Sequence, residues 1–75
     1  METKEFIEKF AEQLETELSN CELTTNFRDL EEWSSLAALN VLMMIDEEYG
    51  VALPADEMRK VNTIQELFDL VQLKL

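Results

Sequence analysis

The fold of this chain is decided by one stretch, Ser34-Ser35-Leu36-Ala37-Ala38-Leu39-Asn40-Val41-Leu42-Met43-Met44-Ile45-Asp46-Glu47-Glu48-Tyr49-Gly50. The two serines favour a helix start, because a serine hydroxyl can accept from a free backbone N–H group. Gly50, the only glycine, favours the helix end. The spacing predicts a helix over 35–49 with an apolar stripe of Leu36, Leu39 and Met43, joined by Leu42. Val41, Met44 and Ile45 add apolar surface, which is typical of a helix at the centre of a bundle.

Three further helices are predicted around this one. Ile7, Phe10, Leu14 and Leu18 recur at helical spacing and predict a first helix over about 3–18. A short helix is expected at 55–60, and the last helix starts at a capping box in which Glu66 follows Thr63 by three residues. The predicted fold class is therefore all-α: a small four-helix bundle with three longer helices and one short third helix, forming a single domain over residues 1–75.

Residues 19–33 are predicted to form a long irregular loop, because they are rich in residues that favour turns. A loop of this length needs apolar anchors in so small a domain, and Leu23, Phe27 and Leu30 are the candidates. Cys21, the only cysteine, lies in this loop and excludes an intramolecular disulfide. It is expected to be an incidental surface thiol.

The strongly negative net charge of the chain limits the kinds of molecule that it is expected to bind. There are 17 acidic residues, 6 basic residues and no histidine, giving a formal net charge of −11. Such a surface repels nucleic acid and anionic membrane and attracts basic partner surfaces. The longest nearly apolar run, 36–45, is much shorter than the about 20 residues that a membrane span requires. The N-terminal residues are charged and lack the apolar segment of a secretory signal peptide. We therefore expect a soluble, cytoplasmic, monomeric protein.

A serine exposed at a helix N-terminus favours an attached phosphate, because free N–H groups and the helix dipole both stabilise an anion there. Serine catalysis would need a base, and a chain without histidine is expected not to be an enzyme. The run that starts at Asp46 does not match a calcium-binding loop, because Gly50 falls at its fifth position and not its sixth. No metal site is predicted.

Taken together, these motifs resemble the acyl carrier proteins and the related peptidyl carrier domains. The resemblance covers almost the whole chain. It rests on the order of a leading amphipathic helix, a long loop with Phe27, the pair Ser35-Leu36, the connector Leu53-Pro54 and the helix start at 63–66.

In that family, the serine of an Asp-Ser-Leu motif carries a covalent 4′-phosphopantetheine arm whose thiol holds acyl or aminoacyl groups as thioesters. The resemblance places Ser35 at the attachment position and Leu36 at the leucine position. Ser34 stands where the family has aspartate, and it can cap the helix without supplying a charge. The partners implied are a phosphopantetheinyl transferase, an acyl- or aminoacyl-activating ligase and downstream synthase enzymes.

The chain departs from the family just after the serine, where acidic residues are usual and Ala37, Ala38 and Asn40 stand instead. This departure predicts an exposed apolar docking surface and a specialised biosynthetic pathway. Trp33, Met44 and Met58 complete the set of predicted partner-docking residues. Trp33 can equally be a staple that packs beside the helix start, and Met43 is expected in the core. The alternative function is an unmodified acidic helical module for protein interaction or regulation.

Overall fold

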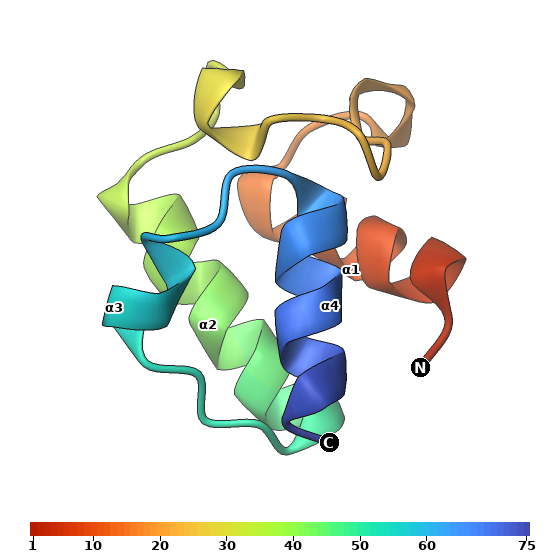
Figure 1. Cartoon of the computed structure of the whole chain (residues 1–75). Helices are drawn as coiled ribbons and strands as arrows, with labels where there is room; N and C mark the ends of the chain where they lie inside the picture. The colour runs from red at the N-terminus through yellow and green to blue at the C-terminus, as the bar shows by residue number, and fades with distance from the viewer.

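The amphipathic patterns along the chain produce helices and no strands. The computed structural model describes all of residues 1–75. The elements are α1 (Thr3–Leu14), the short 3-10 turns η1 (Leu18–Asn20) and η2 (Phe27–Asp29), α2 (Ser35–Tyr49), α3 (Ala55–Met58) and α4 (Ile64–Leu73). Figure 1 shows α1, α2 and α4 as the three longer helices and α3 as one short helix. The all-α, four-helix prediction is confirmed.

Aromatic side chains join these elements into one apolar core. Phe6 of α1 packs edge-on against Phe68 of α4, with ring centres 5.5 Å apart, and lies 5.9 Å from Tyr49 of α2. Phe10 lies 5.7 Å from Phe27 of the long loop. None of the buried residues is polar or charged. Burial of such apolar area is the main favourable contribution to folding in a domain this small.

The first helix is shorter than the sequence predicts. It ends at Leu14, because Glu15 adopts a left-handed conformation (φ 55°) and its N–H donates to carbonyl groups of the last turn. Leu18 lies beyond this end in η1 and is largely exposed, so its predicted place in the apolar stripe of the helix is wrong. Phe6, Phe10, Ala11 and Leu14 form the buried face, which confirms the predicted positions of Phe10 and Leu14.

The second helix has the predicted bounds, and the apolar stripe that the sequence identifies is its exposed face. Leu36, Leu39 and Met43 are 66%, 53% and 51% exposed. We call these three residues the outer stripe. The opposite face is the buried one and consists of Ala37, Val41, Met44 and Ile45. The expectation that Met43 packs in the core is therefore wrong. Both faces of α2 are apolar, so periodicity alone could not decide which of them faces the core.

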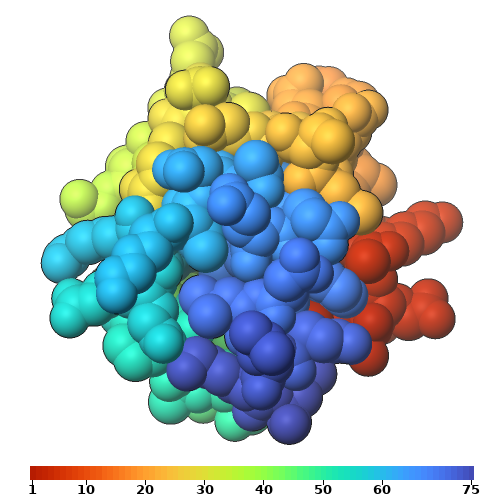
Figure 2. All heavy atoms as spheres, in the orientation of Figure 1, coloured from red at the N-terminus to blue at the C-terminus, as the bar shows by residue number.

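The long loop is held in place by the start of α4. Phe27 N–H donates to the Asn62 carbonyl at 3.0 Å, and Ile64 and Gln65 donate back to Thr25 and Leu23 at 3.1 and 2.9 Å. Figure 2 shows the yellow residues of the loop lying against the blue residues that begin α4. Phe27 is buried, and Leu23 and Leu30 pack against the core, so the predicted anchors are confirmed.

Cys21 corrects another expectation, because its side chain is buried with the core rather than exposed. Burial, and then the nearby charge of Glu32, raise the pKa of the Cys21 thiol. A thiol that resists ionisation is a weak nucleophile. Its place in this structure is that of a small apolar packing residue.

The helix ends follow the sequence signals. Gly50 ends α2 in a left-handed conformation (φ 68°). Thr63 and Glu66 form the predicted capping box: Thr63 Oγ1 accepts from Glu66 N–H at 3.1 Å, and Glu66 Oε1 accepts from Thr63 N–H at 2.9 Å. None of the helices combines the length and the apolar composition needed to cross a bilayer.

Candidate functional site

The two serines at the start of α2 differ in their hydrogen bonding. Ser34 has extended backbone angles and is the N-cap residue, and its hydroxyl oxygen accepts a hydrogen bond from Ala37 N–H at 3.1 Å. This bond satisfies one of the N–H groups that a helix start leaves free. Ser34 is therefore occupied with holding the helix start.

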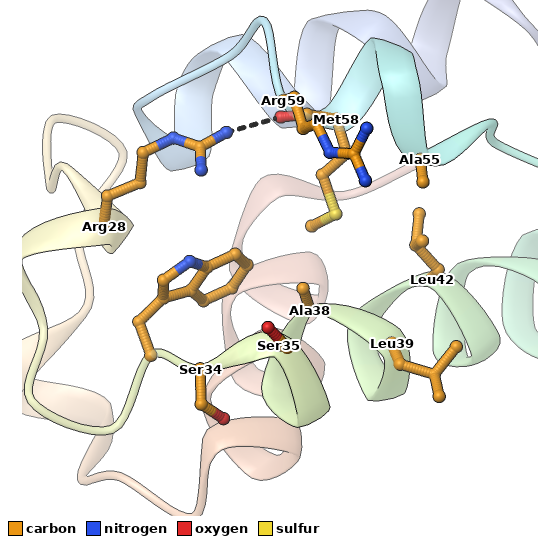
Figure 3. A pocket seen from close by; sticks show the side chains of 10 residues that line it. Arg28, Ser34, Ser35, Ala38, Leu39, Leu42, Ala55, Met58 and Arg59 are labelled. Atoms are coloured by element: carbon orange, nitrogen blue, oxygen red, sulfur yellow. Dashed lines mark hydrogen bonds between the residues drawn. The ribbon is translucent and has the colours of Figure 1, made fainter.

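Ser35 is the first residue of α2, and its side chain is exposed and makes no hydrogen bond within the chain. The backbone N–H groups of Ser35 and Leu36 have no backbone acceptor. They stand at the positive end of the α2 dipole, where an anion is stabilised. Figure 3 shows the Ser35 hydroxyl on the side of α2 that faces Met58 and Arg59, whereas the Ser34 hydroxyl points the other way.

A groove of about 420 Å³ opens beside this hydroxyl, between α2 and α3. We call it the serine groove. The residues that line it are Arg28, Trp33, Ser34, Ser35, Ala38, Leu39, Leu42, Ala55, Met58 and Arg59. Its volume lies in the range of small-molecule sites, and its floor is apolar. No acidic side chain lines it, although acidic residues greatly outnumber basic ones in the chain.

Two arginines supply the charge of the serine groove, and they are held differently. Arg28 is half-buried and donates to the Met58 carbonyl at 2.8 Å and to the Val61 carbonyl at 3.0 Å. These bonds connect the loop to the last residue of α3 and to the segment that follows it. Arg59 is largely exposed and has a single ion pair, with Asp56 at 3.3 Å. Exposed ion pairs of this kind contribute little to stability.

Trp33 precedes the cap and is half-buried. Its ring centre lies 4.6 Å from that of Phe27, and it stacks on Phe10 at 6.3 Å with the ring planes 9° apart. It therefore fastens the start of α2 to the loop and to α1. That Trp33 packs on α2 as a staple stays a prediction, since both rings that it contacts lie outside α2.

The structure separates the other predicted docking residues. Ala37 and Met44 are buried on the inner face of α2, so the predicted exposed surface at Ala37-Ala38 is wrong for Ala37. Met58 is also buried, where it contributes to the wall of the serine groove. Ala38 is half-buried at the groove. Asn40 is half-buried and lies outside the groove.

Sequence reasoning missed Arg28, Arg59, Leu42 and Ala55 as residues of this site. The available signal was charge, because Arg28 and Arg59 are two of only 6 basic residues and each follows a predicted apolar anchor or docking residue. The contacts that bring them to one groove join residues about 30 positions apart, such as Arg28 and Met58. A contact between residues so far apart leaves no local pattern in the sequence from which it could be predicted.

Comparison with known proteins agrees with this geometry. The profile of the family described as "Phosphopantetheine attachment site" matches residues 4–71 of the chain. An acyl carrier protein of Thermosynechococcus vestitus is 28% identical over 79 residues, which cover 100% of this chain and 98% of the relative. The match includes both the helix start that carries the two serines and the segments that enclose the serine groove.

Proposed function

The chain belongs to the phosphopantetheine-attachment family, and from this premise we propose that Ser35 is the residue that receives the 4′-phosphopantetheine arm. Members of this family carry the arm covalently on a serine and act as carriers rather than catalysts. The protein is accordingly a carrier protein and not an enzyme. When bound, the arm supplies a thiol that holds carboxylic acids as reactive thioesters.

The observation that carries the choice of Ser35 is the division of work between the two serines. Ser34 Oγ is engaged as an acceptor in the cap, whereas the Ser35 hydroxyl is exposed and unengaged. A transferase needs an accessible hydroxyl, and the activating base comes from that enzyme. Once attached to Ser35, the phosphodiester lies at the free N–H groups of the helix start, which stabilise its charge.

The lining of the serine groove also fits the phosphopantetheine arm. The serine groove begins at Ser35 and has an apolar floor with two arginines at its edge. Phosphopantetheine combines an anionic phosphodiester with a largely neutral chain. A groove with cationic and apolar parts next to the attachment atom matches this composition.

For partner enzymes, we propose docking on the outer stripe of α2, because Leu36, Leu39 and Met43 are exposed next to the attachment residue. Exposed acids flank the stripe, with Glu31 and Glu32 before it and Asp46 and Glu47 at its far end. A matching partner has an apolar centre and a basic rim. The charges would steer the encounter, and apolar contacts would supply most of the affinity.

The same surface also bears on the choice of partner enzymes. With Asn40 rather than an acid in the middle of α2, docking relies more on apolar contact than on ion pairing. This composition supports a dedicated set of partners: a transferase, an acyl- or aminoacyl-activating ligase and downstream synthases of a specialised pathway. The arm raises the effective concentration of its acyl or aminoacyl cargo at each docked enzyme.

The decisive experiment tests whether the protein can be loaded with the phosphopantetheine arm. Purified protein is incubated with coenzyme A and a broad-specificity phosphopantetheinyl transferase, and the intact mass is measured. We expect the mass to rise by one phosphopantetheinyl group in the wild type and in Ser34→Ala, and to remain unchanged in Ser35→Ala.

The two serine variants make the result specific. A gain in Ser35→Ala together with no gain in Ser34→Ala would move the attachment site to Ser34. No gain in any form would contradict the carrier assignment and favour the acidic interaction module. Circular dichroism of each variant checks that the helices are intact.

A further inference from the structure

We propose that Arg28 is a positioning residue for the loading of Ser35. It holds α3 in place, so that α3 and Ser35 together present one ordered surface to the transferase that attaches the arm. This inference rests on the proposed function, since it takes Ser35 as the attachment residue. Arg28 acts through α3 and does not take part in the transfer itself.

The helix α3 has little to stabilise it on its own. It is a single turn, Ala55–Met58, and its N-cap residue Pro54 makes no side-chain hydrogen bond to the free N–H groups. Isolated helices of this length are not stable in water, because the first turn fixes several backbone angles for one hydrogen bond. Met58 is the only buried residue of α3. The orientation of α3 therefore depends on contacts from elsewhere in the chain.

Arg28 supplies such contacts from the long loop. Its guanidinium donates to the Met58 carbonyl at 2.8 Å, the dashed line in Figure 3, and to the Val61 carbonyl at 3.0 and 3.2 Å. It also donates to Asn62 Oδ1 at 3.2 Å. The Met58 carbonyl lies at the C-terminal end of α3, where the helix dipole favours a positive charge. No backbone N–H group donates to the Val61 carbonyl, so Arg28 is its only donor within the chain.

Arg28 is itself fixed in place, as a support for α3 requires. Its backbone N–H donates to Asn26 Oδ1 at 3.0 Å in the cap of η2. Its guanidinium carbon lies 5.3 Å from the ring centre of Phe27, which is fully buried. The other arginine of the serine groove, Arg59, is 75% exposed and pairs only with Asp56 of α3. A pair within one turn does not fix that turn relative to α2.

One further basic side chain contacts α3, but it connects α3 to a different part of the chain. Lys74 pairs with Glu57 at 2.9 Å and so joins α3 to the end of α4. Arg28 instead joins α3 to the loop that leads into Ser35. Of the two contacts, the one made by Arg28 therefore sets the position of α3 relative to the attachment residue.

The position of α3 matters for loading because the Ser35 hydroxyl faces it across the serine groove (Figure 3). Specific interfaces bury about 800 Å² of each partner, so one that is centred on Ser35 extends over α3 as well. Ala55 and Arg59 line the same groove as Ser35. A surface that must become ordered during binding lowers the affinity, because only its ordered fraction binds. By ordering α3 beforehand, Arg28 raises the affinity of the transferase for the carrier.

The first measurement is the rate of loading at several carrier concentrations, with coenzyme A and a broad-specificity phosphopantetheinyl transferase. Arg28→Met removes the donors and keeps an apolar stem. It should raise KM for the carrier about fivefold and change kcat by less than about twofold, because α3 is ordered once the complex has formed. Lys60→Met is the matched control, since it removes the same charge from an exposed residue that does not line the groove. It should leave KM unchanged.

Amide hydrogen exchange of the unloaded proteins distinguishes positioning of α3 from direct contact between Arg28 and the enzyme. The backbone N–H groups of Arg59 and Val61 close the last turn of α3 and the turn after it. In Arg28→Met these two amides should exchange faster, whereas those of Val41 and Ile45 in α2 should keep the wild-type rates.

Arg28→Lys is a second variant. It keeps the charge but replaces the planar fork, with which one side chain reaches two carbonyls, by a single ammonium group. It should show both changes in smaller measure. If circular dichroism shows that Arg28→Met does not fold, Arg28→Lys decides the question alone.

Four results would overturn the inference. An unchanged KM in Arg28→Met, or an equal rise in Lys60→Met, would remove the role of Arg28 and leave the carrier assignment intact. A raised KM without faster exchange in α3 would show direct contact with the enzyme. Faster exchange in every helix would show a general loss of stability. Failure of the wild type to gain mass would instead overturn the carrier assignment, and this inference with it.

Discussion

The two faces of α2 are almost equally apolar, yet one is buried and the other is exposed. The inner face packs Ala37, Val41, Met44 and Ile45 into the core. The outer stripe leaves two leucines and a methionine largely in solvent. Single exposed apolar residues are ordinary on a protein surface, but an aligned row beside an attachment residue is typical of an interaction site. If partner enzymes dock on the outer stripe as proposed, one helix supplies both the stability of a small domain and its binding surface.

The largest expected effect on stability comes from comparing two adjacent methionines, one on each face of α2. Met44→Ala should lower the free energy of unfolding by about 2–5 kcal/mol, because it leaves a cavity in the core. Met43→Ala should change it by less than about 0.5 kcal/mol, because Met43 is exposed. Urea denaturation followed by circular dichroism measures both values.

The cost of Met44→Ala is comparable with the about 3–5 kcal/mol that the core of so small a domain supplies, so this variant is expected to be partly unfolded in water. Equal losses in the two methionine variants would break the comparison. They would mean that the outer stripe contributes to the core as much as the inner face does.

Much of the fold could be predicted from the sequence because its signals are local. The start and end of α2 follow from Ser34 and Gly50, and the start of α4 follows from Thr63 and Glu66. The end of α1 could not be predicted in this way. Glu15 adopts a left-handed conformation without being glycine or asparagine, and the helical spacing of apolar residues continues past it to Leu18.

The candidate site was predictable only in part, for the same reason. The cap at Ser34 and the exposure of Ser35 follow from the local pattern. The burial of Ala37 depends on how α2 rotates against its neighbours, and the place of Arg59 depends on how the connector folds back over α2. Neither is encoded in the spacing of a single helix.

The second prediction concerns docking on the outer stripe. Leu36→Ala should lower kcat/KM for the phosphopantetheinyl transferase by roughly tenfold, which corresponds to about 1.4 kcal/mol of lost contact. Leu73→Ala is the matched control, since Leu73 is also an exposed leucine but lies at the end of α4. Initial rates of mass gain at several protein concentrations give both values. A similar loss in both variants would remove the special role of the outer stripe.

The third prediction compares the two serines at the start of α2. The Ser34 hydroxyl caps the helix, whereas the Ser35 hydroxyl makes no hydrogen bond within the chain. Ser34→Ala should lower the free energy of unfolding by about 1 kcal/mol, because Ala37 N–H loses its acceptor. Ser35→Ala should leave it unchanged, or raise it slightly, because alanine is the better helix former. Thermal and urea denaturation of the unloaded proteins measure both. A larger loss in Ser35→Ala would show that its hydroxyl contributes to the fold.

The smallest expected effect contrasts the start of α2 with that of α4. Backbone N–H groups of Thr63 and Asn62 donate to the Glu66 carboxylate and hold its pKa below the usual 4.5. A lowered pKa in the folded state gives a stabilisation that is complete above about pH 4.5 and is lost as the pH falls through the folded value. The corresponding position of α2 is Ala37, which cannot titrate.

Glu66→Gln tests this contrast, because glutamine keeps the capping-box geometry without a titrating proton. The stability difference between wild type and Glu66→Gln should be constant above pH 4.5 and should shift in favour of the variant below it. Urea denaturation at a series of pH values measures the difference, in which the titration of the other carboxylates cancels. A difference that does not change with pH would show that the Glu66 carboxylate gains nothing from its N–H donors on folding. The caps of α2 and α4 would then be equivalent in their response to acid.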